Sequence, residues 1–181
     1  MYPIVRLGLT SLRAALSRRI GIDSVCKTTF RCMPWDLDIF FEMNNGRILT
    51  LYDLGRFDLT VRSGLFKRLI RKRWAVVVAG GAVRYRKRIR IFDKVTILTH
   101  VAGFEGRWIY IVQSMWVKGR PVSSVLFRTG VTHMGKTVSV DEVLKEAGIS
   151  GWKTSLPDWV TSWINCEQDR PWPPQPDIGT D

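Results

Sequence analysis

The residues best suited to chemistry lie in one stretch, residues 35–47, where carboxylates stand among large apolar side chains. Asp38 and Glu42 could each act as a general base or a nucleophile. Asn44 and Asn45 follow, and asparagine is strongly favoured at the N-cap of a helix. The first turn of a helix offers free N–H groups and the positive end of the helix dipole, which can polarise a carbonyl or hold an oxyanion. The stretch therefore predicts a site where an attacking group meets a substrate carbonyl.

The element that would position this site is a long helix over residues 44–62. Apolar residues occur on nearly every face of this segment, which is typical of a helix enclosed by other structure, such as a curled sheet. Gly55 lies in its middle, where glycine costs about 1 kcal/mol relative to alanine. That glycine predicts a close contact with a strand or another helix.

Five further segments have the composition and alternation of β-strands. Turn signals separate the last three of them, and such short connections predict an antiparallel meander. The predicted strands are residues 24–33, 74–91, 94–104, 107–117 and 122–134.

The order of these residues also resembles a known family. The run Asp36-x-Asp38-x-x-x-Glu42-Met43-Asn44-Asn45, followed by a helix and strands, is similar to the hotdog-fold acyl-CoA thioesterases of the 4-hydroxybenzoyl-CoA thioesterase-like branch. The segment Met-Asn-Asn-Gly-Arg, together with the Asp-Leu-Gly-Arg of residues 53–56, is most similar to the thioesterase-superfamily-member-6-like subgroup. The resemblance covers roughly residues 24–134.

The resemblance implies an α+β hotdog fold, in which a five-stranded antiparallel sheet wraps around a central long helix. It also implies a homodimer or a dimer of dimers, with sites near the subunit interface. The implied activity is hydrolysis of an acyl-CoA thioester to free acid and CoA. Apart from CoA as part of the substrate, no cofactor is implied.

Two positions depart from the family pattern: Glu42 replaces the usual His, and Ile48 replaces the usual Tyr. A carboxylate cannot reproduce the paired donor and acceptor of a neutral imidazole. These departures keep a second hypothesis open, in which the protein binds acyl-CoA or an acyl chain without catalysis.

Asp38 matches the second aspartate of the family motif, which implies that it attacks the thioester or activates water. Its apolar neighbours are expected to keep the pocket dry and the carboxylate reactive. The alternative is a loop aspartate bonded to local backbone amides. Asp36 is expected to shape the turn, whereas Glu42 either shares the catalytic work or forms an ion pair with Arg47 or Arg56.

Substrate binding is assigned to two groups of residues. Backbone amides around Asn44, Asn45 and Gly46 are expected to polarise the thioester carbonyl, with both asparagines acting as helix caps first. Asp53 is an alternative catalytic carboxylate on the helix, although a salt bridge with Arg56 three residues later is the simpler explanation.

The second group is a set of arginines on one face of the alternating segment 83–91. Arg84, Arg86 and Arg88 could form a ladder for the phosphates of CoA, because guanidinium groups fit phosphate oxygens well. An ordinary solvated sheet face is the alternative.

Composition limits the remaining possibilities. The 181 residues are 45% hydrophobic, which is enough for one core. We therefore expect one domain over residues 23–150. It is preceded by an N-terminal helix (1–22) and followed by a C-terminal segment (151–181) with a short helix and a proline-rich tail. The net charge of +12 favours an anionic partner, but no nucleic-acid-binding motif is present. Three cysteines without a CxxC pair and two separated histidines argue against disulfides and metal sites, and favour the cytoplasm.

The first twenty residues predict a basic amphipathic helix. Its apolar stripe is Val5, Leu9, Leu12, Leu16 and Ile20, and arginines interrupt any run long enough to be a transmembrane helix or a secretory signal. Such a helix either attaches the protein peripherally to an anionic membrane or packs on its own domain or a partner.

Overall fold

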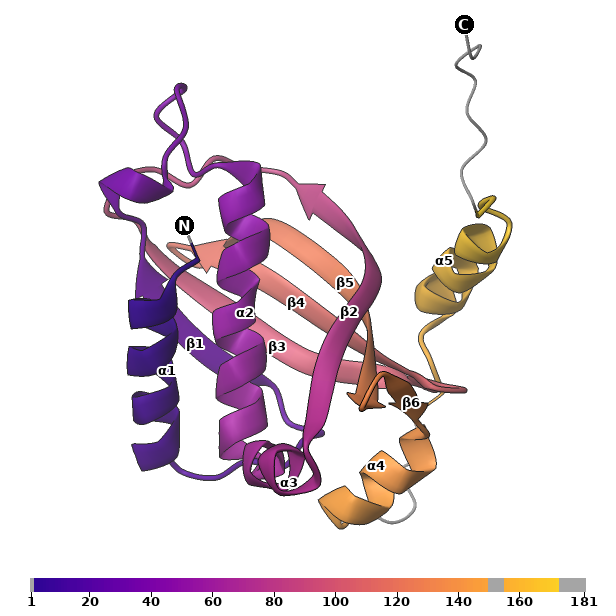
Figure 1. Ribbon diagram of the computed structural model, residues 1–181. Helices are drawn as coiled ribbons and strands as arrows, with labels where there is room; N and C mark the ends of the chain where they lie inside the picture. Colours follow the sequence, from indigo (N-terminus) through magenta and orange to yellow (C-terminus); the bar gives the residue numbers. More distant parts are fainter. Residues whose placement is uncertain (1, 150–154, 173–181) are drawn as a thin grey trace, which may run out of the picture.

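A curled antiparallel sheet encloses a long helix in the computed structural model, which describes residues 2–149 and 155–172 (Figure 1). Five long strands follow the order β1-β3-β4-β5-β2, and a short sixth strand pairs with β5. The strands are β1 (Cys26–Arg31), β2 (Trp74–Tyr85), β3 (Lys94–Glu105), β4 (Trp108–Val117), β5 (Arg120–His133) and β6 (Lys136–Val138).

The central helix α2 (Asn45–Arg62) lies along the concave face of this sheet, as the sequence predicts. Its buried side chains include Leu51, Tyr52 and Leu54, which pack with inward-facing strand residues such as Ile97 and Met115. A second helix, α1 (Ile4–Leu16), covers part of the other side of α2. Because α2 is enclosed on both sides, apolar residues are favoured on nearly all of its faces.

At Gly55 the backbone of α2 lies very close to the sheet. A Cβ atom there would lie 2.3 Å from Thr99 Oγ1 and 2.8 Å from Gln113 Nε2, distances that real Cβ contacts do not reach. The amide of Gln113 donates to Thr99 Oγ1 (2.8 Å) and to the carbonyl of Tyr52 (2.9 Å). Glycine is therefore required by packing, and it is placed against buried polar groups.

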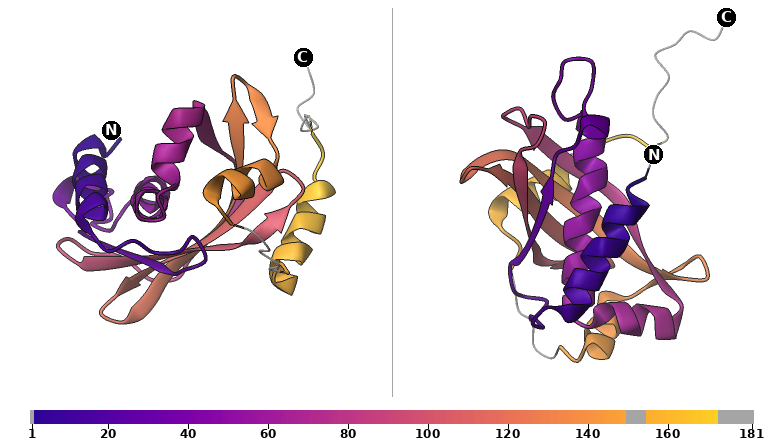
Figure 2. Two further views of the ribbon diagram at one scale, coloured as in Figure 1. Left: turned by 90° about the horizontal axis from the view of Figure 1, so that it is seen from below. Right: turned by 90° about the vertical axis from the view of Figure 1, so that its left-hand side faces the viewer.

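α1 packs on its own domain, but not through the predicted apolar stripe. Leu7 and Ala14 face α2 and the core, whereas Val5, Leu9 and Leu16 are exposed. Figure 2 shows α1 lying alongside α2. The predicted helix is thus confirmed over Ile4–Leu16, while its most apolar face remains open to solvent.

Three shorter helices complete the described residues: α3 (Leu65–Lys72), α4 (Val140–Ala147) and α5 (Asp158–Gln168). α5 lies on the convex face of the sheet, where Val160 and Ile164 pack against Tyr110 and Leu126 (Figure 2). None of the described helices combines the length and the hydropathy needed to cross a bilayer. The proline-rich tail predicted at the C-terminus falls, from residue 173, outside the described residues.

The predicted strand over residues 83–91 is wrong in its second half. β2 ends at Tyr85, because the backbone N–H groups of Arg86 and Lys87 both donate to the carbonyl of Val122 and the chain turns away. It then crosses to the segment before α2, where Met43 N–H donates to the carbonyl of Ile89 (2.9 Å). Consequently the arginines at 84, 86 and 88 do not share one strand face.

Asp36 joins three elements at the start of α2. It is 1% exposed and belongs to the 3-10 helix η1 (Pro34–Asp36). Its carboxylate lies 2.8 Å from the guanidinium of Arg6 in α1 and 2.8 Å from that of Arg47 in α2, and it also accepts from Met33 N–H. The predicted turn residue is therefore also an ionic junction.

Replacing Gly55 tests the close approach of α2. Gly55→Ala should lower the free energy of unfolding by about 2 kcal/mol, because overpacking and disruption of the Gln113 hydrogen bonds outweigh the better helix propensity of alanine. Gly8→Ala is the matched control in α1, with no heavy atom within 4 Å of the added Cβ, and it should raise stability by about 0.5–1 kcal/mol. Urea unfolding measures both, and equal effects would contradict the proposed contact.

Replacing Asp36 tests the ionic junction. Asp36→Asn should destabilise the fold by about 3 kcal/mol, because two largely buried guanidinium groups lose their counter-charge. Asp23 is exposed and makes no hydrogen bond or ion pair within the described residues, so Asp23→Asn should change stability little. Thermal and urea unfolding measure the stability of both variants. Loss of the ionic junction should lower the stability of Asp36→Asn alone, whereas an equal loss in both variants would contradict it.

Candidate active site

A cleft of about 440 Å³ lies beside the first turn of α2. It combines aromatic, charged and amide side chains from the N-terminus, η1 and α2. The lining residues are Tyr2, Trp35, Asp36, Leu37, Asn44, Gly46, Arg47 and Thr50.

The first turn of α2, of which Gly46 lines this cleft, has free hydrogen-bond donors. Asn44 caps the helix, as predicted, because its Oδ1 accepts from the backbone N–H of Arg47 (3.1 Å). Within residues 2–149 and 155–172, the N–H groups of Asn45 and Gly46 have no acceptor. Asn45 is not a cap; its carbonyl accepts from Tyr85 Oη (3.3 Å). These two N–H groups can bind a carbonyl oxygen or an oxyanion.

Asp38 lies in a hairpin, residues 37–43, that precedes α2. Its backbone N–H donates to the carbonyl of Glu42 (2.8 Å), and its Oδ1 accepts from the N–H of Phe40 (2.9 Å). The side chain is half-buried and does not line the cleft, although the preceding Leu37 does. The hydrogen bond to a local backbone amide, which was the structural alternative expected from the sequence, is therefore present.

The expectation that apolar neighbours keep Asp38 dry is wrong for the isolated chain. Ile39, Phe40 and Phe41 are 85%, 71% and 80% exposed, because they form the tip of the hairpin and point away from the core. Only Leu37 packs partly against the core cluster.

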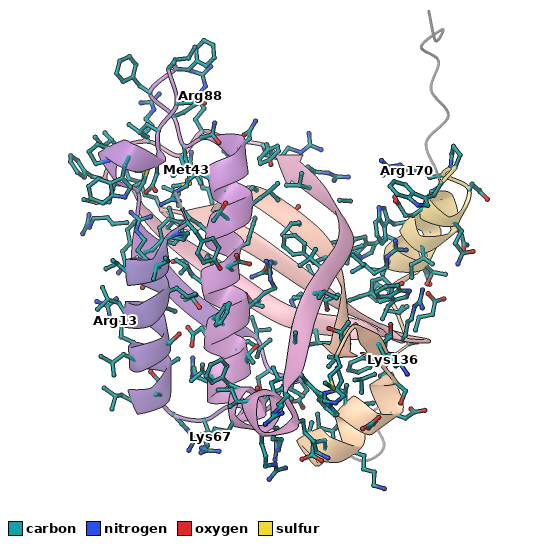
Figure 3. The ribbon with its side chains drawn as sticks, viewed as in Figure 1. Arg13, Met43, Lys67, Arg88, Lys136 and Arg170 are labelled. Carbon is teal, nitrogen blue, oxygen red and sulfur yellow. The ribbon has the colours of Figure 1, made fainter. Side chains whose placement is uncertain are left out.

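Glu42 forms an ion pair with Arg88, at 2.8 Å between Oε2 and Nε. The partners foreseen for it are both engaged elsewhere: Arg47 with Asp36, and Arg56 with Asp53. Figure 3 shows Arg88 at the end of the molecule from which the hairpin projects, with Met43 beneath it. The loop after β2 thus brings a guanidinium to the hairpin, which the predicted straight strand did not anticipate.

Asp53 forms the salt bridge with Arg56 that was expected for this helix pair. It also accepts from the hydroxyl of Tyr2 (2.9 Å), and burial, with help from Asp53, raises the pKa of Tyr2 to about 12. Burial lowers the pKa of Arg56, while Asp53 opposes that shift. Arg56 therefore compensates the charge of Asp53, and Tyr2 donates a hydrogen bond to it.

A buried polar chain extends from this pair and was missed in the sequence. Arg56 donates to Gln113 Oε1 (2.8 Å), and its guanidinium carbon lies 4.1 Å from the centre of the Phe127 ring. The detectable signal was Gln113 itself, a polar residue in the inward-facing set of β4 between Ile111 and Met115.

A second missed group, around Asp58, lies farther along α2. Asp58 is buried and accepts from Thr28 Oγ1 (2.6 Å). Burial raises the pKa of Cys26 to about 11, and Asp58 adds to that shift, so this thiol is neutral at physiological pH. No three His, Cys, Asp or Glu side chains among the described residues lie close enough to hold a metal ion.

Arg84 and Arg86 lie apart from the cleft. Arg84 lines a separate cavity of about 520 Å³ between α5 and the convex face of the sheet, together with Trp159 and Trp163. Arg86 is exposed in the loop after β2 and has no ion pair within the described residues. Of the three predicted phosphate-binding arginines, only Arg88 lies at the hairpin.

Known proteins agree with this architecture. The sequence profile of the thioesterase-like superfamily matches residues 32–164. Two relatives, both named Protein THEM6, come from Xenopus laevis, with 36% identity over 95 residues, and Drosophila melanogaster, with 28% identity over 138 residues. These matches cover 52% and 75% of this chain, but 46% and 69% of the relatives, so the chain spans less than half of the frog protein.

Solved structures give the same fold. A probable thioesterase from Escherichia coli, YbaW, superposes with a TM-score of 0.63 at 21% identity, covering 67% of this chain and 95% of that one. SAV2348 from Staphylococcus aureus, solved in complex with CoA, gives 0.62 at 10% identity, covering 80% and 96%. The predicted hotdog fold is confirmed, and the chain belongs to the thioesterase-like superfamily.

Proposed function

We propose that this protein hydrolyses an acyl-CoA thioester to the free acid and CoA. The observation that carries the proposal is the pair of free N–H groups, on Asn45 and Gly46, beside a cleft at the positive end of α2. The superfamily membership supports a thioester substrate, and a structural neighbour solved with CoA supports the CoA moiety.

In the proposed reaction the two amides hydrogen-bond the thioester oxygen. Asp38 takes a proton from water, the resulting hydroxide adds to the carbonyl carbon, and the negative charge on oxygen is held by the amides and the helix dipole. The carbon–sulfur bond then breaks, and the thiolate of CoA leaves with the proton held by Asp38. Direct attack by Asp38, followed by hydrolysis of the anhydride, is the alternative route to the same products.

Glu42 and Arg88 have a joint role in this proposal. Their ion pair holds Arg88 beside the hairpin, from where it, with Arg86 on the same loop, could bind the phosphates of CoA. Arg84 lines the cavity on the convex face, so in this proposal it could contact only a part of CoA that is distant from the thioester.

The second candidate function is binding of acyl-CoA without hydrolysis. It is favoured by one observation: the residue in place of the family's His, Glu42, is engaged by Arg88 rather than directed at the cleft.

We also infer that the protein is a homodimer, or a dimer of dimers, joined through β2. This strand is an edge of the sheet, and Val76, Val77 and Val78 on it are exposed. A long apolar edge strand is prone to pair with another chain, and a twofold axis between two β2 strands would satisfy both copies.

The first prediction of the proposed mechanism concerns Asp38. Asp38→Asn should lower turnover by roughly 10²-fold or more, because the amide cannot accept a proton from water, while thermal stability should hardly change. Hydrolysis across short, long and aromatic acyl-CoAs and thermal unfolding should be measured on one preparation, with Glu42→Gln beside it.

Turnover of Asp38→Asn at the wild-type level would move the chemistry to Glu42 or Asp53. A wild type that binds acyl-CoA but hydrolyses none of these substrates would instead identify a binding protein.

The second prediction concerns the β2 edge. Light scattering should give at least twice the 20.8 kDa of one chain, and Val76→Lys/Val78→Lys should yield a monomer, because like charges would face each other across the paired strands. Val25 is equally exposed but lies near the opposite edge of the sheet, so Val25→Lys should leave the assembly intact. A monomeric wild type would contradict the inference.

A further inference from the structure

The tip of the hairpin is an exposed apolar protrusion. The backbone pairs Leu37 with Met43 and carries Ile39, Phe40 and Phe41 beyond the end of α2, where Figures 1 and 2 show the loop projecting from the molecule. Soluble proteins rarely expose three consecutive large apolar side chains, and contiguous apolar patches of this kind usually mark an interaction site.

The conformation of Phe41 strengthens this argument. Its φ of 58° lies in the left-handed region, which is uncommon for a bulky residue and easier for glycine or asparagine. Nothing in the turn itself favours phenylalanine there. The presence of phenylalanine at position 41 is therefore better explained by a contact with another molecule than by the folding of the loop.

A second apolar surface lies on α1. Its exposed stripe is Val5, Leu9, Leu12 and Leu16. Ile4, the first residue of α1, and Tyr2, which precedes the helix, are also exposed. Trp35, 67% exposed, connects the two surfaces, since it lines the same cleft as Tyr2 and its ring lies 5.9 Å from the Arg6 guanidinium.

Basic residues surround both surfaces. Arg86, Lys87 and Arg90 are exposed on the loop after β2, whose Arg90 forms a backbone bridge with Glu42 of the hairpin, and they have no ion pair within the described residues. Arg13, Arg18 and Arg19 are exposed on α1 and just after it, and they are likewise unpaired there. Apolar side chains ringed by uncompensated cations are complementary to an anionic lipid surface.

α1 lies away from the strand that joins the proposed dimer. β2 is at one edge of the sheet, whereas α1 lies toward the β1 edge, and the hairpin projects beyond the end of α2 (Figure 1). A second copy joined through β2 would therefore lie at the edge of the sheet opposite the α1 stripe.

We propose that the hairpin tip (Ile39, Phe40 and Phe41) and the α1 stripe (Val5, Leu9, Leu12 and Leu16) form a docking surface for anionic lipid bilayers. The tip inserts among the acyl chains near the headgroups, and the surrounding arginines and lysine bind the anionic headgroups. This docking goes beyond the proposed hydrolysis and does not depend on it.

The test is cosedimentation of the full chain with vesicles of phosphatidylcholine, with and without phosphatidylglycerol. The wild type should bind the anionic vesicles, more weakly at high NaCl concentration, and bind the neutral vesicles less. Ile39→Ser/Phe40→Ser/Phe41→Ser should lower the partition coefficient at least about 10-fold, since three apolar side chains lose their insertion. Leu9→Ser/Leu12→Ser/Leu16→Ser should also lower it.

The control replaces three exposed apolar residues outside the docking surface, as Ile70→Ser/Met134→Ser/Trp159→Ser, and should bind as the wild type does. The proposal is overturned by a wild type that does not bind anionic vesicles, or by a tip variant that binds them equally well. A tip variant that keeps vesicle binding but becomes monomeric would show that a second copy covers the tip. Asp38→Asn should retain binding, which separates this proposal from the catalytic one.

Discussion

The packing of α2 against the concave face of the sheet is the constraint on which the rest of the structure depends. At Gly55 the helix backbone comes so close to β3 and β4 that no side chain fits, and the buried polar groups there must bond to one another. Gln113 meets this demand by bonding to Thr99, to the backbone of α2 and to Arg56. The helix is consequently fixed in depth and rotation, and its first turn is fixed with it.

The candidate site inherits its rigidity from that first turn. Asp36 ties the turn to α1 and η1 through two guanidinium groups, so the free amides of Asn45 and Gly46 have a defined direction before any substrate binds. The hairpin that carries Asp38 leaves from the same junction but is supported only at its base. The candidate site therefore combines a fixed pair of free amides with a carboxylate on a projecting loop.

The carboxylates of α2 have partners that explain them without catalysis. Asp53 is ion-paired with Arg56 and accepts a hydrogen bond from Tyr2, and Asp58 accepts a hydrogen bond from Thr28 in the core. Asp38, by contrast, is bonded only to a local amide among the described residues. Among the described residues Asp38 has no ion pair, and for that reason the proposed mechanism assigns it the role of the base.

The sequence by itself determined the enclosed helix, its Asn44 cap, the antiparallel strands and the Asp53–Arg56 pair, because periodicity, capping and spacing along a helix are local properties. Only the tertiary structure decided which distant charges meet: Glu42 with Arg88, and Asp36 with Arg6 and Arg47. It also decided that the apolar residues beside Asp38 face solvent instead of closing a pocket. Such outcomes follow from the path of loops, above all the turn after Tyr85, and residue spacing alone does not specify that path because it depends on which distant backbone groups are free to bond.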